Sequence, residues 1–373
     1  MQPLPVLYVI HSLGQGGSER QLATVARALD RRRFQPHAVS VLDGFRADEL
    51  RQDGIPVWRL PFRSYVGPSA IRAVRELCRY IMREKVALVH TFDYSLSPLG
   101  VAAARLCPGV RVLSSQRCYM ELVPRKYRHL LMASHWMADG VVTNCEALRR
   151  HLHDTYKYPA SRIEVCWNGI DTRRFQADKR KRLDEVQDAA LVIGTVCVLR
   201  AEKRLDLLLE SFAAVRNASP GMKLLVVGSG PEEKALHAAA AKLGIAGQCV
   251  FLPSTPDVTA ALSSIDVFVH PSMTEGLPNA VMEAMACGCA VITSNVGGCP
   301  ELIDHGVHGL LFKPGEAGEL TFTLRTAVGE PELRKRMAAA AAKRMREQFS
   351  ISAAAKRMGE IYGGVLDRTE GTV

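Results

Sequence analysis

Residues 266–301 constrain the fold of this chain more than any other stretch. An apolar run at residues 267–269 predicts a buried strand that ends in a loop. Pro278 suits the first position of a helix, and Gly288 marks the place where that helix stops. A second apolar run at residues 290–293 predicts another buried strand. Strand, loop, helix and strand together form a βαβ unit, whose ligands bind at the carboxyl ends of the strands.

Two glutamates stand in this unit with seven residues between them: Glu275 in the predicted loop and Glu283 in the predicted helix. The backbone N–H groups of Gly276, Leu277 and Asn279 at the helix start suit a phosphate or pyrophosphate. A carboxylate beside a phosphate is repelled by it, so we expect Glu283 to bind ribose hydroxyls and Glu275 to face a transferred group. The alternative is that both acids only stabilise a helix N-terminus, but Glu283 lies too far into the predicted helix for that role.

The run EGLPNAVMEAMACGCAVITSNVGGCPELI resembles the donor-site signature of the family 4 retaining nucleotide-sugar glycosyltransferases. In that family, two glutamates with this spacing follow the strand that forms the sugar-nucleotide cleft. The resemblance covers nearly the whole chain. It implies the GT-B architecture, which consists of two facing, doubly wound, Rossmann-like α/β domains.

The domain boundaries follow from the same resemblance and from composition. We expect an N-terminal acceptor-binding domain at residues 1–176 and a nucleotide-sugar donor-binding domain at residues 190–349. The charged, apolar-poor segment at residues 176–189 has the composition of a linker. The resemblance further implies that a helix in residues 350–373 crosses back to the first domain.

A glycine-rich turn follows the first apolar strand and precedes a helix that Ser18 can cap. It resembles the family's first loop, which closes over the donor phosphates and the acceptor, and we assign Gly16 and Gly17 to that role as donor-binding residues. The turn also raises the alternative of an NAD-dependent oxidoreductase. That alternative is disfavoured, because the glycine spacing is wrong and the acid, Asp43, comes too late for the dinucleotide fingerprint.

Arg200 and Lys203 follow the apolar strand at residues 191–198, just before a predicted helix. Two cations in this position suit a pyrophosphate. In the family, an arginine and a lysine of this loop bind the donor diphosphate. Lys203 matches the family's lysine. The family's arginine often stands five residues before the lysine, where this chain has Val198, so we expect Arg200 to take its place.

Strand and helix signals alternate through the first half of the chain, which predicts a parallel, doubly wound sheet. Polar residues at its strand ends are expected to line a cleft: His90, Asp93, Gln116, Arg117 and Asn144. For His90 we favour a hydrogen-bonded structural role. The family's catalytic histidine falls in the loop SSQRCY of this chain, which contains none, so either Gln116 or Arg117 occupies that region.

The net charge of +10 is concentrated in the first half of the chain. Residues 1–180 contain 28 Lys+Arg and 16 Asp+Glu (+12), whereas residues 181–373 contain 20 and 22 (−2). No nucleic-acid module is present, so an anionic membrane face or a phosphate-linked lipid acceptor fits this charge better, with a merely solvated face as the alternative. The N-terminus reads as a core strand and the ten cysteines are scattered, which favours a cytoplasmic protein. From the basic first half, we expect it to be peripheral at the inner membrane face.

The sequence therefore predicts a glycosyltransferase that moves a sugar from a nucleoside diphosphate sugar, such as a UDP-sugar, to an acceptor hydroxyl. The resemblance implies retention of configuration, no cofactor or metal, and a role in surface polysaccharide or lipid-linked saccharide synthesis. Glu275, Arg200 and Lys203 are the expected catalytic residues. The alternative from another class is a non-catalytic nucleotide-binding or membrane-associated scaffold protein.

Overall fold

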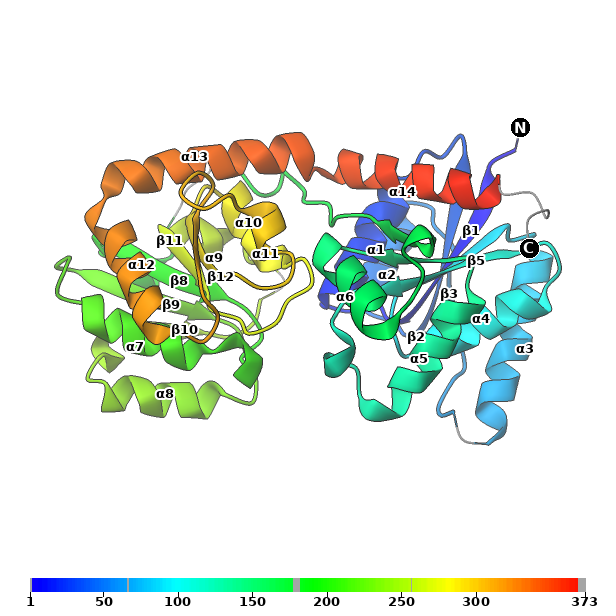
Figure 1. The fold of residues 1–373 in the computed structure, drawn as a ribbon, viewed down its shortest axis with the longest axis horizontal. Coiled ribbons are helices and arrows are strands. Elements are labelled where there is room, and N and C mark those ends of the chain that lie inside the picture. The colour runs from blue at the N-terminus through cyan, green and yellow to red at the C-terminus, as the bar shows by residue number, and fades with distance from the viewer. Residues whose placement is uncertain (1, 66, 177–181, 256, 368–373) are drawn as a thin grey trace. The chain divides into compact units, whose positions relative to one another are not determined.

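The computed structural model describes residues 2–65, 67–176, 182–255 and 257–367 (Figure 1). The chain divides into two compact units: unit 1 is Met1–Gly169 with Ile351–Val373, and unit 2 is Ile170–Ser350. The sequence placed the first boundary later, at residue 176, and the last one at residues 349 and 350. Part of the expected linker, residues 177–181, and the last six residues of the expected terminal segment lie outside the described residues.

Unit 1 is built on a seven-stranded parallel sheet in the order β3-β2-β1-β4-β5-β6-β7. Its strands are β1 (Leu4–Ser12), β2 (Phe34–Leu42), β3 (Val57–Arg59), β4 (Leu88–Thr91), β5 (Arg111–Gln116), β6 (Gly140–Thr143) and β7 (Ile163–Val165). Its α-helices are α1 (Gly17–Ala28), α2 (Phe45–Gln52), α3 (Pro68–Arg83), α4 (Ser97–Leu106), α5 (Arg125–Met137), α6 (Glu146–Tyr156) and α14 (Ile351–Leu366).

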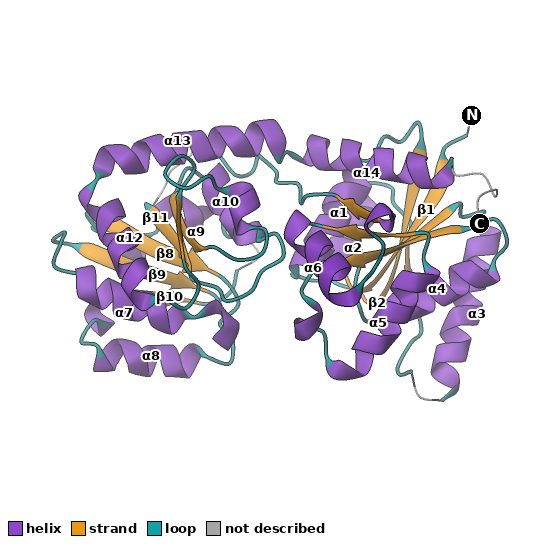
Figure 2. Cartoon of the chain, in the orientation of Figure 1, coloured by secondary structure: helices purple, strands orange, loops and turns teal. Residues whose placement is uncertain are grey.

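Helices cover both faces of this sheet (Figure 2). Successive side chains of a strand point to opposite faces, so a strand buried on both sides reads as a continuous apolar run. In β1, Tyr8 belongs to the core on one face together with Leu22 of α1. Its neighbour Val9 belongs to the core on the other face together with Leu77 of α3.

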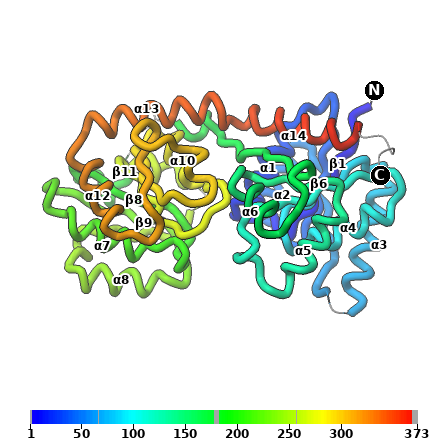
Figure 3. Tube along the Cα trace, viewed as in Figure 1, coloured from blue at the N-terminus to red at the C-terminus, as the bar shows by residue number. Residues whose placement is uncertain are grey.

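The last helix, α14, returns to unit 1 and packs on α1 (Figure 3). Its Tyr362 hydroxyl lies 2.7 Å from Nδ1 of His90 and donates to the Tyr8 hydroxyl at 3.1 Å. The Nε2 atom of His90 lies 2.9 Å from the Ser115 hydroxyl. Burial lowers the pKa of His90 to about 3, which keeps the imidazole neutral. His90 therefore has the structural role that the sequence favoured.

Unit 2 contains a six-stranded parallel sheet in the order β10-β9-β8-β11-β12-β13. Its strands are β8 (Leu191–Val196), β9 (Met222–Val227), β10 (Cys249–Leu252), β11 (Val267–His270), β12 (Ala290–Ser294) and β13 (Leu310–Phe312). Its α-helices are α7 (Leu205–Val215), α8 (Glu233–Lys242), α9 (Thr259–Ser264), α10 (Asn279–Ala286), α11 (Cys299–Leu302), α12 (Ala317–Gly329) and α13 (Pro331–Gln348).

The βαβ unit predicted at residues 266–301 is present as β11, α10 and β12, and its two strands pair in parallel. The helix begins one residue later than expected, because Pro278 is the N-cap and Asn279 is the first helical residue. The left-handed residue that follows the helix is Gly288, with φ of 72°, a conformation that glycine adopts without strain.

The strand order of each sheet reverses at one point. In unit 1 this switch lies between β1 and β4, and in unit 2 it lies between β8 and β11. Loops that leave two such strands run in opposite directions and open a crevice at their carboxyl ends. The structure confirms the predicted fold class of two doubly wound, Rossmann-like α/β domains, and its topology marks one candidate site in each unit.

Candidate functional site

At the switch point of unit 2, the loops after β8 and β11 bring Lys203 and Glu275 together. The Nζ atom of Lys203 lies 2.5 Å from Oε1 of Glu275. The two loops are also joined through the backbone, because the Glu202 carbonyl accepts hydrogen bonds from the N–H of Met273 at 2.8 Å and from the Ser272 hydroxyl at 3.3 Å. This ion pair is the centre of the candidate donor site.

His270, the last residue of β11, contacts the same carboxylate. Its Nε2 atom lies 2.7 Å from Oε1 of Glu275, and its side chain is buried. The sequence analysis did not single out His270, which directly follows the apolar run at residues 267–269. The signal that could have found it is its position: a side chain at the carboxyl end of a strand beside the switch point lies next to the ligand crevice.

Electrostatics keeps the pair ionised. Burial alone would raise the pKa of Glu275, whose side chain is 12% exposed, but His270 and Lys203 hold this pKa at about 2. Burial would likewise lower the pKa of Lys203, but Glu275 shifts it above its ordinary value. Both groups are therefore charged at neutral pH.

Arg200 lies outside this cluster. Its side chain is 61% exposed, and its Nη1 atom is 3.9 Å from Oε1 of Glu202. The structure therefore brings together two of the three predicted catalytic residues, Lys203 and Glu275, and leaves Arg200 at the surface of the same loop.

The start of α10 presents the other predicted donor contacts. Gly276 and Asn279 are partly exposed, whereas Leu277 is buried. Glu283, on the second turn of α10, is 2% exposed. The structure therefore leaves two of these predicted contacts partly exposed and buries the other two.

The loop after β12 packs against the loop that carries Glu275 and Gly276. The N–H of Gly298 donates to the Gly276 carbonyl at 2.8 Å. Gly297 has φ of 51°, and a Cβ atom there would lie 1.9 Å from the Glu275 carbonyl oxygen. Only glycine permits so close an approach of the two backbones. Gly297 therefore holds the loop that carries Glu275 in its position.

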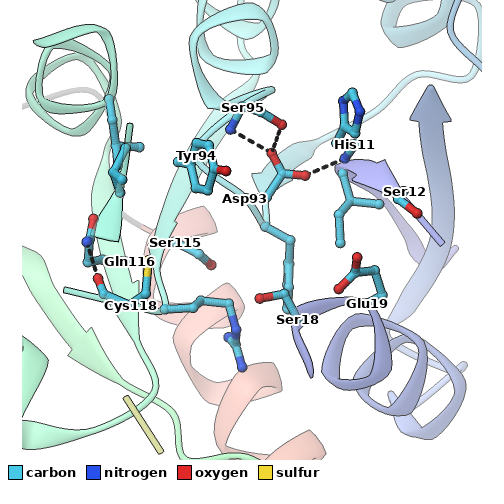
Figure 4. A pocket seen from close by; sticks show the side chains of 15 residues that line it. His11, Ser12, Ser18, Glu19, Asp93, Tyr94, Ser95, Ser115, Gln116 and Cys118 are labelled. Atoms are coloured by element: carbon cyan, nitrogen blue, oxygen red, sulfur yellow. Dashed lines mark hydrogen bonds between the residues drawn. The ribbon is translucent and has the colours of Figure 1, made fainter. Parts of the chain in front are cut away.

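Unit 1 has a cavity of about 280 Å³ at its own switch point (Figure 4). Its walls come from the ends of β1, β4 and β5, the first turn of α1 and the segment before and within α5. The polar residues of the lining are His11, Ser12, Ser18, Glu19, Asp93, Tyr94, Ser95, Ser115, Gln116 and Arg117. Of the five strand-end residues named from the sequence, Asp93, Gln116 and Arg117 line the cavity, whereas His90 and Asn144 do not.

Asp93 is held by several donors. Its Oδ1 atom accepts hydrogen bonds at 2.8 Å from the N–H and the hydroxyl of Ser95 and from the N–H of Leu96. Its Oδ2 atom accepts from the backbone N–H of His11 (Figure 4). The carboxylate is therefore fixed in one orientation at the end of β4.

Gln116 and Arg117, in the region of the family's histidine, are both engaged. The Gln116 amide donates to the Cys118 carbonyl, and its oxygen lies 2.9 Å from Nε2 of His135. Burial lowers the pKa of His135 to about 3. Arg117 donates to Oδ1 of Asn168 at 2.6 Å. In the described structure, Gln116 has both ends of its amide hydrogen-bonded within the protein.

The start of α1 differs from the expectation in its capping. Gly16 is the N-cap, and Ser18, the expected cap, is the second helical residue. A Cβ atom built on Gly16 would lie 2.0 Å from Oε2 of Glu19, so the Glu19 carboxylate lies over the helix start. Burial raises the pKa of Glu19, and the nearby charge of Asp93 adds to this shift.

Two features of the described residues bear on ligands and membranes. No group of three or more His, Cys, Asp or Glu side chains in the described part of the chain is placed to hold a metal ion. Among the same residues, no helix combines the length and the apolar character that crossing a membrane requires.

Comparison with known proteins gives matches along most of the chain. Residues 15–174 match the family described as Glycosyltransferase Family 4, and residues 176–344 match Glycosyl transferases group 1. A D-inositol 3-phosphate glycosyltransferase of Segniliparus rotundus is 31% identical over 186 residues, which are 47% of this chain and 41% of that protein. The amylovoran biosynthesis glycosyltransferase AmsK of Erwinia amylovora is 32% identical over 214 residues, 54% of this chain and 51% of that protein. The chain thus matches about half the length of these curated relatives.

Among solved structures, Anabaena HepE in complex with UDP is similar over 97% of this chain and 100% of that chain. The TM-score is 0.84 and the sequence identity is 21%, so this likeness concerns the fold. The same protein has also been crystallised in complex with UDP-glucose.

Proposed function

The chain belongs to the group 1, family 4 glycosyltransferases, and we propose that it transfers a sugar from a nucleoside diphosphate sugar to an acceptor hydroxyl. The observation that carries the proposal is the ionised Lys203–Glu275 pair with His270 at the switch point of unit 2. The UDP and UDP-glucose complexes of the structurally similar Anabaena protein make a UDP-hexose the first donor to test.

The donor diphosphate is assigned to the start of α10. The N–H groups of Gly276, Leu277 and Asn279 and the positive end of the helix dipole would bind it. Lys203 has three N–H donors, so it can contact a phosphate oxygen while it remains paired with Glu275. Arg200, exposed on the same loop, would add a second cation, and Glu283 would accept hydrogen bonds from ribose hydroxyls.

The transfer step then needs charge stabilisation at two places. As the bond from the anomeric carbon to the diphosphate oxygen breaks, negative charge grows on the diphosphate, which Arg200 and Lys203 stabilise. Positive charge grows on the sugar ring, which the Glu275 carboxylate stabilises. The acceptor oxygen forms the new bond to the anomeric carbon, and its proton passes to the leaving diphosphate. Attack from the side of the leaving group gives retention.

We assign the acceptor to the cavity of unit 1. Of the two contacts that the family resemblance implied for Gly16 and Gly17, we propose the acceptor contact and not the donor-phosphate contact. A phosphate at this helix start would have to displace the Glu19 carboxylate, which lies over Gly16.

The biosynthetic role of the reaction and its place in the cell are a further part of the proposal. The relative that takes part in amylovoran biosynthesis supports a role in surface polysaccharide or lipid-linked saccharide synthesis. An anionic membrane surface is the proposed partner of unit 1. On α3, the apolar side chains of Ile71 and Met82 are exposed near the two ends of the helix. Four arginines are exposed on the same helix, and the last two pair with Glu76 and Glu84: Arg72, Arg75, Arg79 and Arg83. Cations and apolar groups on one helix favour binding at such a surface.

Release of the nucleoside diphosphate tests the function. The protein is incubated with a panel of nucleotide sugars, and the released diphosphate is measured with and without added acceptors. We expect release with at least one donor, and the same rate after treatment with EDTA. Binding of the nucleotide sugar without any release would favour the non-catalytic scaffold protein instead.

A further inference from the structure

We propose that the cavity of unit 1 selects an acceptor whose bound end is rich in hydroxyl groups and is neutral or cationic, and that it rejects a phosphorylated or carboxylated end. The inference rests on the proposed function, because it names the chemical class of the acceptor in that transfer. It comes from the arrangement of the charged groups in the cavity wall (Figure 4).

The first charged group is Glu19, at the start of α1. A helix N-terminus attracts anions, because its N–H groups and the positive end of its dipole point at the ligand. Here the chain's own carboxylate already occupies that position, with Glu19 Oε2 within 2.0 Å of the place that a Cβ atom of Gly16 would take. A phosphate or carboxylate of a ligand would therefore meet a carboxylate where other helix starts offer a positive field.

Asp93 supplies a second carboxylate to the same cavity. Three of its hydrogen bonds go to Oδ1 and one, from the His11 N–H, goes to Oδ2. A carboxylate oxygen can accept about two hydrogen bonds, so Oδ2 has capacity for a further donor. A ligand hydroxyl or ammonium group can provide that donor, whereas an ionised phosphate or carboxylate has none to give.

The arginine of the lining contacts groups other than these two acids. Arg117 donates to Asn168, which is not part of the lining, and its guanidinium carbon lies 4.9 Å from the ring centre of Phe92. Glu19 and Asp93 are the two acids of the lining, and Arg46 of α2, which is not part of the lining, is a cation close enough to interact with Glu19.

Neutral polar groups complete the wall. The hydroxyl-bearing residues Ser12, Ser18 and Tyr94 line the cavity together with the two acids. Ligand hydroxyls can both donate to the carboxylates and exchange hydrogen bonds with these side chains, as a sugar or cyclitol ring requires. An amino group on such a ring would gain attraction to Glu19 and Asp93.

The experiment compares acceptor candidates that differ only in charge. The probes are myo-inositol against inositol 3-phosphate, and methyl glucoside against its 6-phosphate and its 2-amino analogue. Binding to the full chain is measured by calorimetry, and diphosphate release is measured with the active donor. We expect the neutral and amino probes to be favoured over the phosphorylated ones by about tenfold or more, since like charges placed together are the usual device for rejecting a ligand.

Two variants and a control locate the effect. Glu19→Gln and Asp93→Asn should each reduce the preference for the neutral and amino probes over the phosphorylated probes, because each removes one negative charge from the cavity wall. Asp48→Asn removes the same charge from α2, outside the lining, and should leave the preference unchanged. Binding is compared at two ionic strengths, because the part of the preference that is electrostatic weakens with salt.

The outcomes separate this inference from the function on which it rests. The proposed function alone is tested without acceptor, by measuring the slow hydrolysis of the donor and the binding of the nucleoside diphosphate. If that chemistry is present, the inference is overturned by equal or better use of the phosphorylated probes, by an unchanged preference in both variants, or by binding of none of the probes. If the donor is neither bound nor hydrolysed, the proposed function itself fails.

Discussion

Lys203 and Glu275 stand 72 residues apart in the chain, and their charged atoms lie 2.5 Å apart at the carboxyl edge of the sheet in unit 2. The pair joins the two loops that leave the switch point in opposite directions. His270 contacts the same carboxylate oxygen. One cluster therefore ties the position of Glu275 to both neighbouring central strands.

Replacing Lys203 by methionine should destabilise the protein. The change removes the lysine from the largely buried Glu275 carboxylate and leaves the contact with His270, and breaking one side of a buried pair typically costs about 3 kcal/mol. Urea unfolding of the variant measures the loss. Lys313→Met removes an exposed cation that pairs with Glu316, and should change the free energy of unfolding by less than about 1 kcal/mol. Equal effects of the two changes would contradict the assigned burial.

The pH dependence of stability should report the ionised Glu275. Its pKa in the folded protein, about 2, lies below the ordinary value of 4.5, so the folded state binds fewer protons than the unfolded state as the pH falls through this range. The stabilisation, about 3 kcal/mol, is present above about pH 5 and is lost progressively down to about pH 2. Urea unfolding of the wild type and of Glu275→Gln measures it. Their difference should shrink on acidification, and a difference that stays constant with pH would refute the assignment.

His270 should act as a positioning residue for Glu275. His270→Ala removes a hydrogen bond to the carboxylate, and we expect kcat to fall by about tenfold to a hundredfold with little change in KM for the donor, because small displacements of a reacting group are costly. His270→Gln keeps a side-chain donor and should restore part of kcat. A fall in kcat that the glutamine does not relieve, or a change confined to KM, would point to a different role.

Gly297 should be more sensitive to substitution than other glycines of the same backbone conformation. Gly297→Ala places a Cβ atom 1.9 Å from the Glu275 carbonyl, so the loop that carries Glu275 must move. Gly315 also has a positive φ, 81°, but a Cβ atom there meets only Met273 at ordinary contact distance. We expect Gly315→Ala to cost about 1 kcal/mol of stability with activity kept, and Gly297→Ala to reduce both stability and kcat. Normal kcat in folded Gly297→Ala would contradict the proposed support of the loop.

The sequence contained enough to predict the architecture. Alternating apolar runs and helix signals report which residues are buried, and the proline and the glycines around α10 report where the chain turns. These local patterns led to the βαβ unit, to Glu275 and to Lys203 as separate candidates.

The partners of those candidates could not be predicted in the same way. The Lys203–Glu275 pair, the tie between Gln116 and His135, and the Glu19 carboxylate over Gly16 depend on how loops fold against each other. A periodic pattern specifies the buried face of a strand or a helix, but not which side chains meet at its end. For the same reason, the sequence could not show that Arg200 is exposed whereas Lys203 is largely buried against an acid, although both were candidate ligands of the diphosphate.

The most direct test of the account is the rate of diphosphate release by Glu275→Gln, which removes the negative charge from the centre of the donor site and keeps its shape. Glu316→Gln, an exposed change in the same unit, is the control. We predict that Glu275→Gln remains folded and binds the nucleoside diphosphate, while its kcat falls by about a hundredfold or more, as expected when a charge that acts on the transition state is removed. Turnover by Glu275→Gln at the wild-type rate would contradict the central claim.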